Sequence, residues 1–599
     1  MMINRNIAIL KQQLHILIQS KRMEEVKCVA QNILHIAPKD SDANLCLAQI
    51  YESEGESIRA VEYYWAASKA SLPGKTRNLI LEKAVDLCNR NNLFEHGLKP
   101  AEAFVQARPG YGKALFFYGL FLHKAKFFPK AIEYLSSAHE KIPSNVWCLN
   151  YLALSYAYSG RADEAMRCFD KCEALNSEEY RTSTFRVYAY NCIFNVNERE
   201  SYLAHRKFGA GLEDRFPERV IKRQKPVGEK LRIGYISADF YWHSVSYFFR
   251  AALLGDARKN FDIYCYSDCD KPDGMTEELI AASNVWRESR ALSDQQLCNQ
   301  ILADKIDILV DLSGYASRNR MEVFARRAAP IQVTYLGYPN TTGLSRIDYR
   351  LTDEQSDPEG MTEKFHTEEL QRLPGGFLCY YPNVCAPRVV PLPASLNGGQ
   401  VCFGSFNAFQ KIGPQLLEAW AKILKQVENA KLIIKAGPLH DAELCTWVRQ
   451  HFEREGVDPL RVELMGWTGG KADHLELYSK IDLHLDTFPY NGTTTTCEAL
   501  WQGVPTVTFA GEVHRARVGY SILSQLGMED YVAHNIEDYI ATAIEKANDI
   551  AELSKLRVQL RERMQKSTLM DVEHFSDKLA DAYTKMYVKN LSLPAVCET

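Results

Sequence analysis

The stretch IDLHLDTFPYNGTTTTCEALWQGVPTVTFAG, residues 481–511, decides the fold. Apolar and polar residues alternate over 481–486, which indicates a short strand, and 506–510 is a second run of strand type. Between them a helical pattern covers about 496–501. It stops before Gly503, because glycine and the proline that follows do not continue a helix. The stretch therefore predicts a β-α-β unit.

The start of that helix carries a run of hydroxyl groups. An Asn-Gly turn is followed by four threonines, Thr493, Thr494, Thr495 and Thr496. Free backbone amides and the positive end of the helix dipole favour an anion there, such as a diphosphate, and the hydroxyls add donors. Glu498, about one turn further on, can accept hydrogen bonds from a ribose diol. The residues alone also fit a simple helix cap, so both interpretations stay open.

From Lys230 onward, strand patterns alternate with helical patterns. Apolar runs of this kind imply parallel sheets that are covered on both faces. The expected strands are 231–237, 261–267, 306–312 and 331–337, followed by 401–406, 431–437, 462–466, 481–486 and 506–510. A proline-rich link at 382–393 separates the two series. They predict two doubly wound α/β domains, with a ligand cleft at the carboxyl ends of the strands.

The N-terminal third repeats itself every 34 residues. Ala131 and Ala165 lie one period apart, and small, aromatic and proline positions recur around them. Small residues are needed where two helices cross closely, and aromatic residues fill the gap between repeats, as in tetratricopeptide repeats. We expect about five helix pairs, with a degenerate pair at 75–109. Their groove is expected to dock extended protein segments; a scaffold or a dimerisation arm is the alternative.

The chain is thus expected to have four parts. They are a tetratricopeptide-repeat α-solenoid (1–178), a helical connector (179–229), a first α/β domain on the acceptor side (230–390), and a second α/β domain that binds the nucleotide and ends in a closing helix (391–599).

Several motifs resemble one family. The segment DTFPYNGTTTTCEALWQGVP is similar to the donor-binding segment of the SPINDLY / O-linked N-acetylglucosamine transferases, glycosyltransferase family 41, which are nucleotide-sugar-dependent protein O-glycosyltransferases. Further similar segments are 231–249, 307–320, 329–353 and 403–414. The resemblance covers roughly 230–590. It implies a GT-B fold, two doubly wound α/β domains, after the repeat solenoid.

The resemblance also implies roles for single residues. Lys411, in GSFNAFQKIGP, stabilises the charge of the departing diphosphate. His243, in ADFYWHSVSYFF, is a candidate base near acceptor and donor. Tyr315, a third candidate catalytic residue, follows another strand, where many SPINDLY-like sequences have histidine. The donor-binding set comprises Asn407, Lys471, His474, Thr493, Thr494, Thr495 and Glu498, with the His474 ring stacked on the base. Without the resemblance, His243 and Lys411 fit a structural histidine and a surface lysine.

One motif suggests a metal. Asp268-Cys-Asp270 has the DxD pattern of metal-dependent glycosyltransferases, but it lies far in sequence from the donor segment. The family works without a metal. We therefore expect a solvated turn there, no metal site, and no cofactor besides the nucleotide-sugar co-substrate.

The composition sets limits on partners and compartment. With 599 residues, 46% of them hydrophobic and 24% charged, the chain is an ordinary globular protein of two to four domains. Its net charge of −4 gives no reason to expect nucleic-acid or membrane partners. Sixteen cysteines without a CxxC pair indicate reduced thiols. No signal peptide or long apolar run is recognisable, so we expect a cytoplasmic protein; export without a cleaved signal and a dimer through the repeats stay open.

Two donors stay open. Thr493 replaces a histidine of the animal N-acetylglucosamine enzymes, and GYPNTTG resembles the plant SPINDLY branch, which uses GDP-fucose. Tyr315 resembles the UDP-N-acetylglucosamine branch instead. The resemblance thus implies inverting transfer of N-acetylglucosamine or fucose to Ser/Thr hydroxyls of proteins. The alternatives are a repeat adaptor with a decayed transferase half, and transfer to asparagine or to a small molecule.

Overall fold

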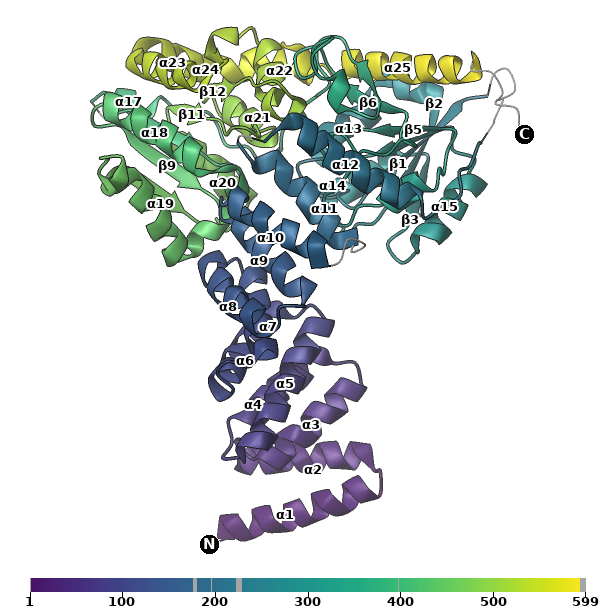
Figure 1. Cartoon of the computed structure of the whole chain (residues 1–599), viewed down its shortest axis with the longest axis vertical. Coiled ribbons are helices and arrows are strands. Elements are labelled where there is room, and N and C mark those ends of the chain that lie inside the picture. The colour runs from purple at the N-terminus through teal and green to yellow at the C-terminus, as the bar shows by residue number, and fades with distance from the viewer. Residues whose placement is uncertain (1, 176–179, 195, 222–228, 397, 593–599) are drawn as a thin grey trace. The chain divides into compact units, whose positions relative to one another are not determined.

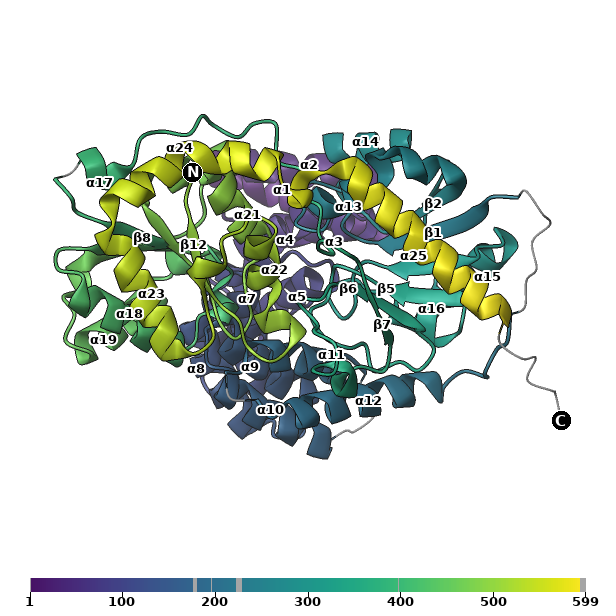
Figure 2. The same cartoon turned by 90° about the horizontal axis from the view of Figure 1, so that it is seen from above.

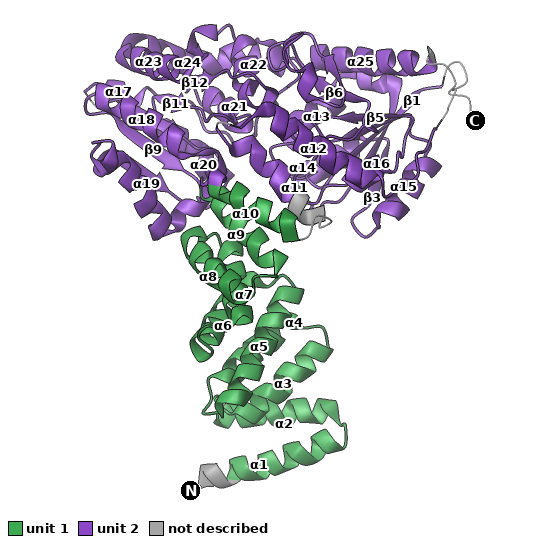
Figure 3. Ribbon diagram, viewed as in Figure 1, with its two compact units in different colours: residues 1–159, 164–179 green, residues 160–163, 180–599 purple. Residues whose placement is uncertain are grey.

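The computed structural model describes residues 2–175, 180–194, 196–221, 229–396 and 398–592. The chain divides into two compact units, coloured separately in Figure 3. The first comprises Met1–Ser159 and Glu164–Glu179, and the second comprises Gly160–Asp163 and Tyr180–Thr599.

Residues 2–175 form ten α-helices that follow one another as five helix-turn-helix pairs (Figure 1). The helices are α1 (Met2–Gln19), α2 (Met23–Ile36), α3 (Ser41–Ser53), α4 (Ser57–Ser68), α5 (Gly74–Arg90), α6 (Phe94–Ala107), α7 (Gly112–Lys124), α8 (Phe128–Lys141), α9 (Val146–Tyr158) and α10 (Ala162–Leu175). From α1 to α9, each helix packs against the next. The predicted repeat solenoid is confirmed.

The degenerate repeat at 75–109 is the helix pair α5 and α6. Gly97 stands one period before Ala131, which is fully buried, as is Ala165 one period later. A Cβ atom on Gly97 would lie 2.4 Å from a ring carbon of Phe121 on α7. The small position of the repeat therefore persists as a glycine, because a phenylalanine of the next helix occupies the space.

After the repeats, the second unit continues with α11 (Tyr180–Ala189) and α12 (Glu198–Glu213). Val187 and Leu212 from these helices are buried in one cluster with Tyr315 and Tyr338 of the first α/β domain. The connector is therefore packed as part of this unit.

The first sheet has seven parallel strands in the order β3-β2-β1-β4-β5-β6-β7. The strands are β1 (Leu231–Ser237), β2 (Phe261–Ser267), β3 (Val285–Glu288), β4 (Ile308–Asp311), β5 (Ile331–Thr334), β6 (Tyr349–Thr352) and β7 (Glu369–Arg372). Its helices are α13 (Ser246–Leu254), α14 (Gly274–Ala282), α15 (Asp294–Ala303) and α16 (Met321–Ala325). The sequence patterns missed β3, β6 and β7, which have four residues each and include charged side chains.

The second sheet has six parallel strands in the order β10-β9-β8-β11-β12-β13. The strands are β8 (Cys402–Ser405), β9 (Lys431–Lys435), β10 (Val462–Met465), β11 (Leu483–Leu485), β12 (Thr506–Phe509) and β13 (Val532–Ala533). The helices of this half are α17 (Pro393–Leu396), α18 (Pro414–Gln426), α19 (Ala442–Arg454), α20 (Lys471–Glu476), α21 (Thr494–Trp501), α22 (Val518–Ser524), α23 (Ile536–Asn548) and α24 (Ile550–Gln565). Because β11 and β12 pair in parallel around α21, the predicted β-α-β unit is present.

The last helix, α25 (Val572–Ser592), packs against α13 and β5 of the first half. Figure 2 shows it in yellow across the elements of the first sheet. The Tyr583 hydroxyl lies 3.0 Å from the hydroxyl of Tyr235 on β1. The closing helix thus follows the second domain in sequence but completes the core of the first. Among the described residues, no helix is long and apolar enough to cross a membrane.

Candidate active site

A buried carboxylate fixes the turn between β11 and α21. Asp486 accepts hydrogen bonds from the Gly492 amide at 2.7 Å and from the Thr508 hydroxyl at 2.7 Å. Burial raises the pKa of Asp486 to about 6, against the effect of these hydrogen bonds. A Cβ atom on Gly492 would stand 2.9 Å from the Asp486 carboxylate, so glycine is required for this close approach.

The threonines begin α21 as expected. Thr493 occupies the position before the helix and makes no side-chain capping hydrogen bond. Thr493, Thr494 and Thr495 are partly exposed, whereas Thr496 is buried and donates to the Gly492 carbonyl at 3.1 Å. The simple cap interpretation therefore does not describe Thr493, and three hydroxyls remain at the helix start. That they bind a diphosphate stays a prediction.

Lys411 lies beside this turn, although 80 residues separate the two in sequence. It ends a short 3₁₀ turn after β8, and its Nζ atom donates to the Asn491 carbonyl at 2.7 Å. The same atom lies 3.7 Å from the centroid of the Tyr490 ring. Burial lowers the pKa of Lys411 to about 8, although the nearby Asp486 carboxylate raises it. A cation is thus held next to a helix N-terminus, where an anion is favoured.

Asn407 also points to this turn. Its side chain is 2% exposed, and its Oδ1 atom lies 3.0 Å from the place where a Cβ atom of Gly492 would stand. Its Nδ2 atom has no hydrogen-bond partner among the described residues. A buried amide donor without a partner is costly. This orphan donor fits an oxygen-rich ligand at the position predicted for the donor.

Glu498 of α21 is buried, and its carboxylate contacts one lysine and one histidine. Its carboxylate forms an ion pair with Lys471 and lies 3.0 Å from Nε2 of His474, both on α20. Burial raises the pKa of Glu498, but His474 and Lys471 outweigh this effect and leave the pKa below its ordinary value. The structure therefore brings three of the predicted donor-binding residues together.

Lys435, at the end of β9, belongs to this cluster and was missed from the sequence. Its Nζ atom lies 2.7 Å from Nδ1 of His474, and burial lowers its pKa to about 8. Because an ammonium can only donate and a carboxylate accepts, Nδ1 of His474 accepts from Lys435 and Nε2 carries the proton toward Glu498. Both ring nitrogens are thereby engaged, which leaves a ring face for stacking. A lysine ending an apolar strand, KLIIK, was the available signal.

His243 lies in the loop between β1 and α13, as predicted, and its side chain is 37% exposed. Nδ1 lies 3.6 Å from the Asp239 carboxylate and accepts a hydrogen bond from the Val245 backbone amide at 3.4 Å. Burial lowers the pKa of His243, and Asp239 opposes this effect. Further along α13, the Tyr247 ring lies 5.2 Å from Nζ of Lys471. The helix that follows His243 therefore contacts the Glu498 cluster.

Tyr315 follows β4 but is only 2% exposed. Its hydroxyl donates to the Thr342 carbonyl, and its ring packs against Phe208 at 5.0 Å and Tyr338 at 5.4 Å. These contacts give Tyr315 a structural role between β4 and α12. Its catalytic assignment stays a prediction.

The DxD motif is solvated only in part, since Asp270 is exposed. Asp268 is 4% exposed and receives two hydrogen bonds from the Arg320 guanidinium, at 2.7 and 2.8 Å. Asp270 pairs with Arg318 at 2.7 Å. The interpretation of Asp268 as solvated was wrong, because an arginine from a distant loop neutralises it. Within the described ranges, no group of three or more His, Cys, Asp or Glu is arranged to hold a metal ion. Metal independence stays a prediction.

Two doubly wound domains, with a lysine, a helix start and a buried acid at the carboxyl ends of the second sheet, define a GT-B architecture. The chain belongs to glycosyl transferase family 41, whose family model matches residues 210–380 and 393–579.

Several relatives carry related names. The chain is 40% identical over 431 residues to the "Probable UDP-N-acetylglucosamine--peptide N-acetylglucosaminyltransferase SPINDLY" of Oryza sativa subsp. japonica, which covers 70% of this chain and 46% of the relative. It is 30% identical over 371 residues to the "Probable UDP-N-acetylglucosamine--peptide N-acetylglucosaminyltransferase SEC" of Arabidopsis thaliana, which covers 60% of this chain and 37% of the relative. The chain spans about half the length, or less, of these curated relatives. A solved structure of a Thermobaculum terrenum O-GlcNAc transferase mutant superposes with a TM-score of 0.78 at 30% identity, covering 87% of this chain and 99% of that chain.

Proposed function

We propose that this chain is an inverting protein O-glycosyltransferase, which moves a sugar from a nucleotide sugar to Ser/Thr hydroxyls of proteins. The observation that carries the proposal is the Lys411 ammonium held at the start of α21. Negative charge builds on the departing diphosphate as the glycosidic bond breaks. A fixed cation and free helix-start amides stabilise that charge in the transition state more than in the ground state.

The remaining clusters fit the two other parts of such a reaction. Glu498 offers carboxylate oxygens to a ribose, and the engaged His474 ring offers a face to a base. In the displacement, the acceptor hydroxyl oxygen bonds to the anomeric carbon, the bond to the diphosphate breaks, and the hydroxyl proton passes to a base. His243 is the proposed base, since its lowered pKa keeps the imidazole neutral at pH 7.

The names of the relatives favour UDP-N-acetylglucosamine as the donor. GDP-fucose remains the competing donor, because the motifs resemble the SPINDLY branch. The repeat solenoid is proposed to hold protein substrates, since a curved array presents an extended surface to a peptide.

The test supplies each donor separately with a protein acceptor. Release of nucleoside diphosphate and the mass added to peptides are measured. We expect release of nucleoside diphosphate with one donor, together with an N-acetylhexosamine or a deoxyhexose adduct on Ser or Thr. Nucleotide binding without release from either donor would instead identify a non-catalytic adaptor, and an adduct on asparagine would show a different acceptor.

A further inference from the structure

Asn491 connects Lys411 to a segment further along the chain. Its backbone carbonyl accepts a hydrogen bond from Nζ of Lys411, and its backbone amide donates to the Arg515 carbonyl at 2.9 Å. Its Oδ1 atom accepts from the Gly519 amide at 3.2 Å. Asn491 is fully buried, and its Nδ2 atom also donates to the Thr487 carbonyl at 3.0 Å and to the Phe509 carbonyl at 3.2 Å. The position of the Lys411 ammonium therefore depends in part on residues 515–519, which supply the partners of the Asn491 backbone amide and Oδ1.

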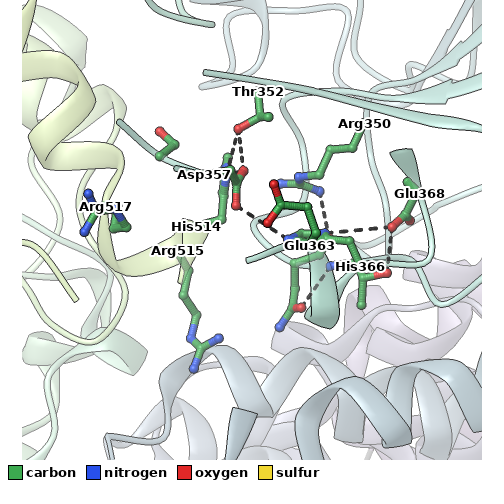
Figure 4. A network of polar contacts seen from close by, with 12 residues as sticks. Arg350, Thr352, Asp357, Glu363, His366, Glu368, His514, Arg515 and Arg517 are labelled. Carbon is green, nitrogen blue, oxygen red and sulfur yellow. Dashed lines mark hydrogen bonds and ion pairs between the residues drawn. The ribbon is translucent and has the colours of Figure 1, made fainter. Parts of the chain in front are cut away.

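Residues 514–517 contact the first α/β domain (Figure 4). Nδ1 of His514 donates to the Asp357 carboxylate at 2.6 Å, and Nε of Arg517 donates to the Gln355 carbonyl at 2.7 Å. The Thr352 hydroxyl at the end of β6 also donates to Asp357. Asp357 is fully buried and His514 is 4% exposed. The loop after β6 thus fixes the backbone next to Arg515.

A second tether comes from α12. The Arg515 guanidinium, which Figure 4 shows pointing away from Asp357, donates two hydrogen bonds to Glu198, at 3.0 and 2.5 Å. Arg515 is 2% exposed, whereas the Glu198 side chain is 22% exposed. A two-point pair of this kind fixes orientation as well as distance. Arg515 therefore has fixed partners at both ends: its backbone carbonyl contacts Asn491, and its guanidinium contacts Glu198.

The charges around Asp357 make the tether rigid. The His366 ring lies between two buried carboxylates, with Nε2 at 3.6 Å from Asp357 and Nδ1 at 3.9 Å from Glu368. Burial raises the pKa of Asp357, but His514 and His366 outweigh this and hold it well below its ordinary value. An ionised, buried carboxylate keeps its partners, because leaving it unpaired is costly.

We propose that His514 and Glu198 are positioning residues for Lys411, acting through Arg515 and the Asn491 carbonyl. The inference rests on the proposed function in one respect, that Lys411 meets the diphosphate of a nucleotide. Neither residue needs to touch the nucleotide. If His514 and Glu198 only hold the two α/β domains together, their loss should lower the affinity for every ligand. If they position Lys411, their loss should lower the affinity for a diphosphate only when Lys411 is present.

The test is a double-mutant cycle on the full chain. His514→Ala and Glu198→Gln are each placed in the wild type and in Lys411→Met, and the affinities for GDP, UDP and the two nucleosides are measured by calorimetry. We expect each change to weaken diphosphate binding about tenfold in the wild type, the size of one hydrogen bond to a charged group, and less than about twofold in Lys411→Met. Nucleoside affinity should not change.

Further variants keep the outcome decisive. His514→Asn places an amide donor near the Nδ1 position and should restore most of the affinity. If His514→Ala does not fold, Glu198→Gln decides, because it preserves shape at a partly exposed site. Equal losses with and without Lys411, or no loss in either variant, would overturn the inference while leaving the proposed function intact. A wild-type chain that binds neither GDP nor UDP would refute the proposed function itself, and this inference with it.

Discussion

Replacing Lys411 by methionine removes one charge while keeping the length of the side chain. At about 4 Å, two unit charges in partly buried surroundings interact by about 4 kcal/mol, when the effective dielectric constant is near 20. Loss of one donor to a developing oxyanion costs about 10²–10³ in kcat in enzymes that have been tested. We therefore expect kcat to fall by about 10²–10³. KM for the donor should change much less, because the charge develops in the transition state.

The same substitution is expected to stabilise the fold. The pKa of Lys411 falls from 10.5 to about 8 on folding, chiefly through burial. Allowing for its partial exposure, the buried charge costs about 1–3 kcal/mol at pH 7. Since the folded protein binds fewer protons than the unfolded chain between about pH 8 and 10.5, the stability of the wild type rises with pH over this window. Methionine removes both the cost and the pH dependence.

Nucleoside diphosphate release at saturating donor measures kcat, and thermal unfolding measures stability. Lys422→Met is the matched control, because Lys422 is 48% exposed on α18 and pairs only with Glu418 among the ion pairs of the described residues. It should leave both quantities near wild type. A Lys411→Met variant with kcat within threefold of wild type would refute the diphosphate role. A fall in Tm together with kcat would show that the loss comes from unfolding.

Four further outcomes are expected. The transfer rate should fall above about pH 8 as Lys411 loses its proton, and a rate that stays level to pH 10 would contradict this. Lys435→Met should raise donor KM about tenfold with kcat nearly unchanged, as it loses one charge-assisted hydrogen bond on the base side; an equal effect on kcat would argue against that role. Transfer should survive EDTA, whereas a loss reversed by added metal would implicate Asp268 and Asp270. Deleting the repeats, residues 1–178, should lower kcat/KM for a full-length protein acceptor and spare donor hydrolysis; a folded deletion variant as efficient as wild type would make the repeats a scaffold.

The local sequence pattern determined the helical repeats and the β-α-β unit of this protein. The repeats were readable because the packing of one helix pair on the next demands a small residue at a fixed period, whether Gly97, Ala131 or Ala165. The β-α-β unit was readable because strand and helix periods change sharply around Gly503. Motif resemblance then indicated Lys411 and Glu498, which the structure places beside the same helix.

Contacts between distant segments were decided only by the tertiary structure. Short strands with charged residues, such as β3 and β7, lack a readable apolar run and form because a neighbouring strand of the sheet pairs with them. Lys435 contacts a histidine that lies 39 residues away in sequence. Asp268 is buried against an arginine that lies 52 residues away. The link from His514 to Lys411 combines several such contacts. Sequence spacing carries no information about them, because the energy of each comes from burial that the complete fold creates.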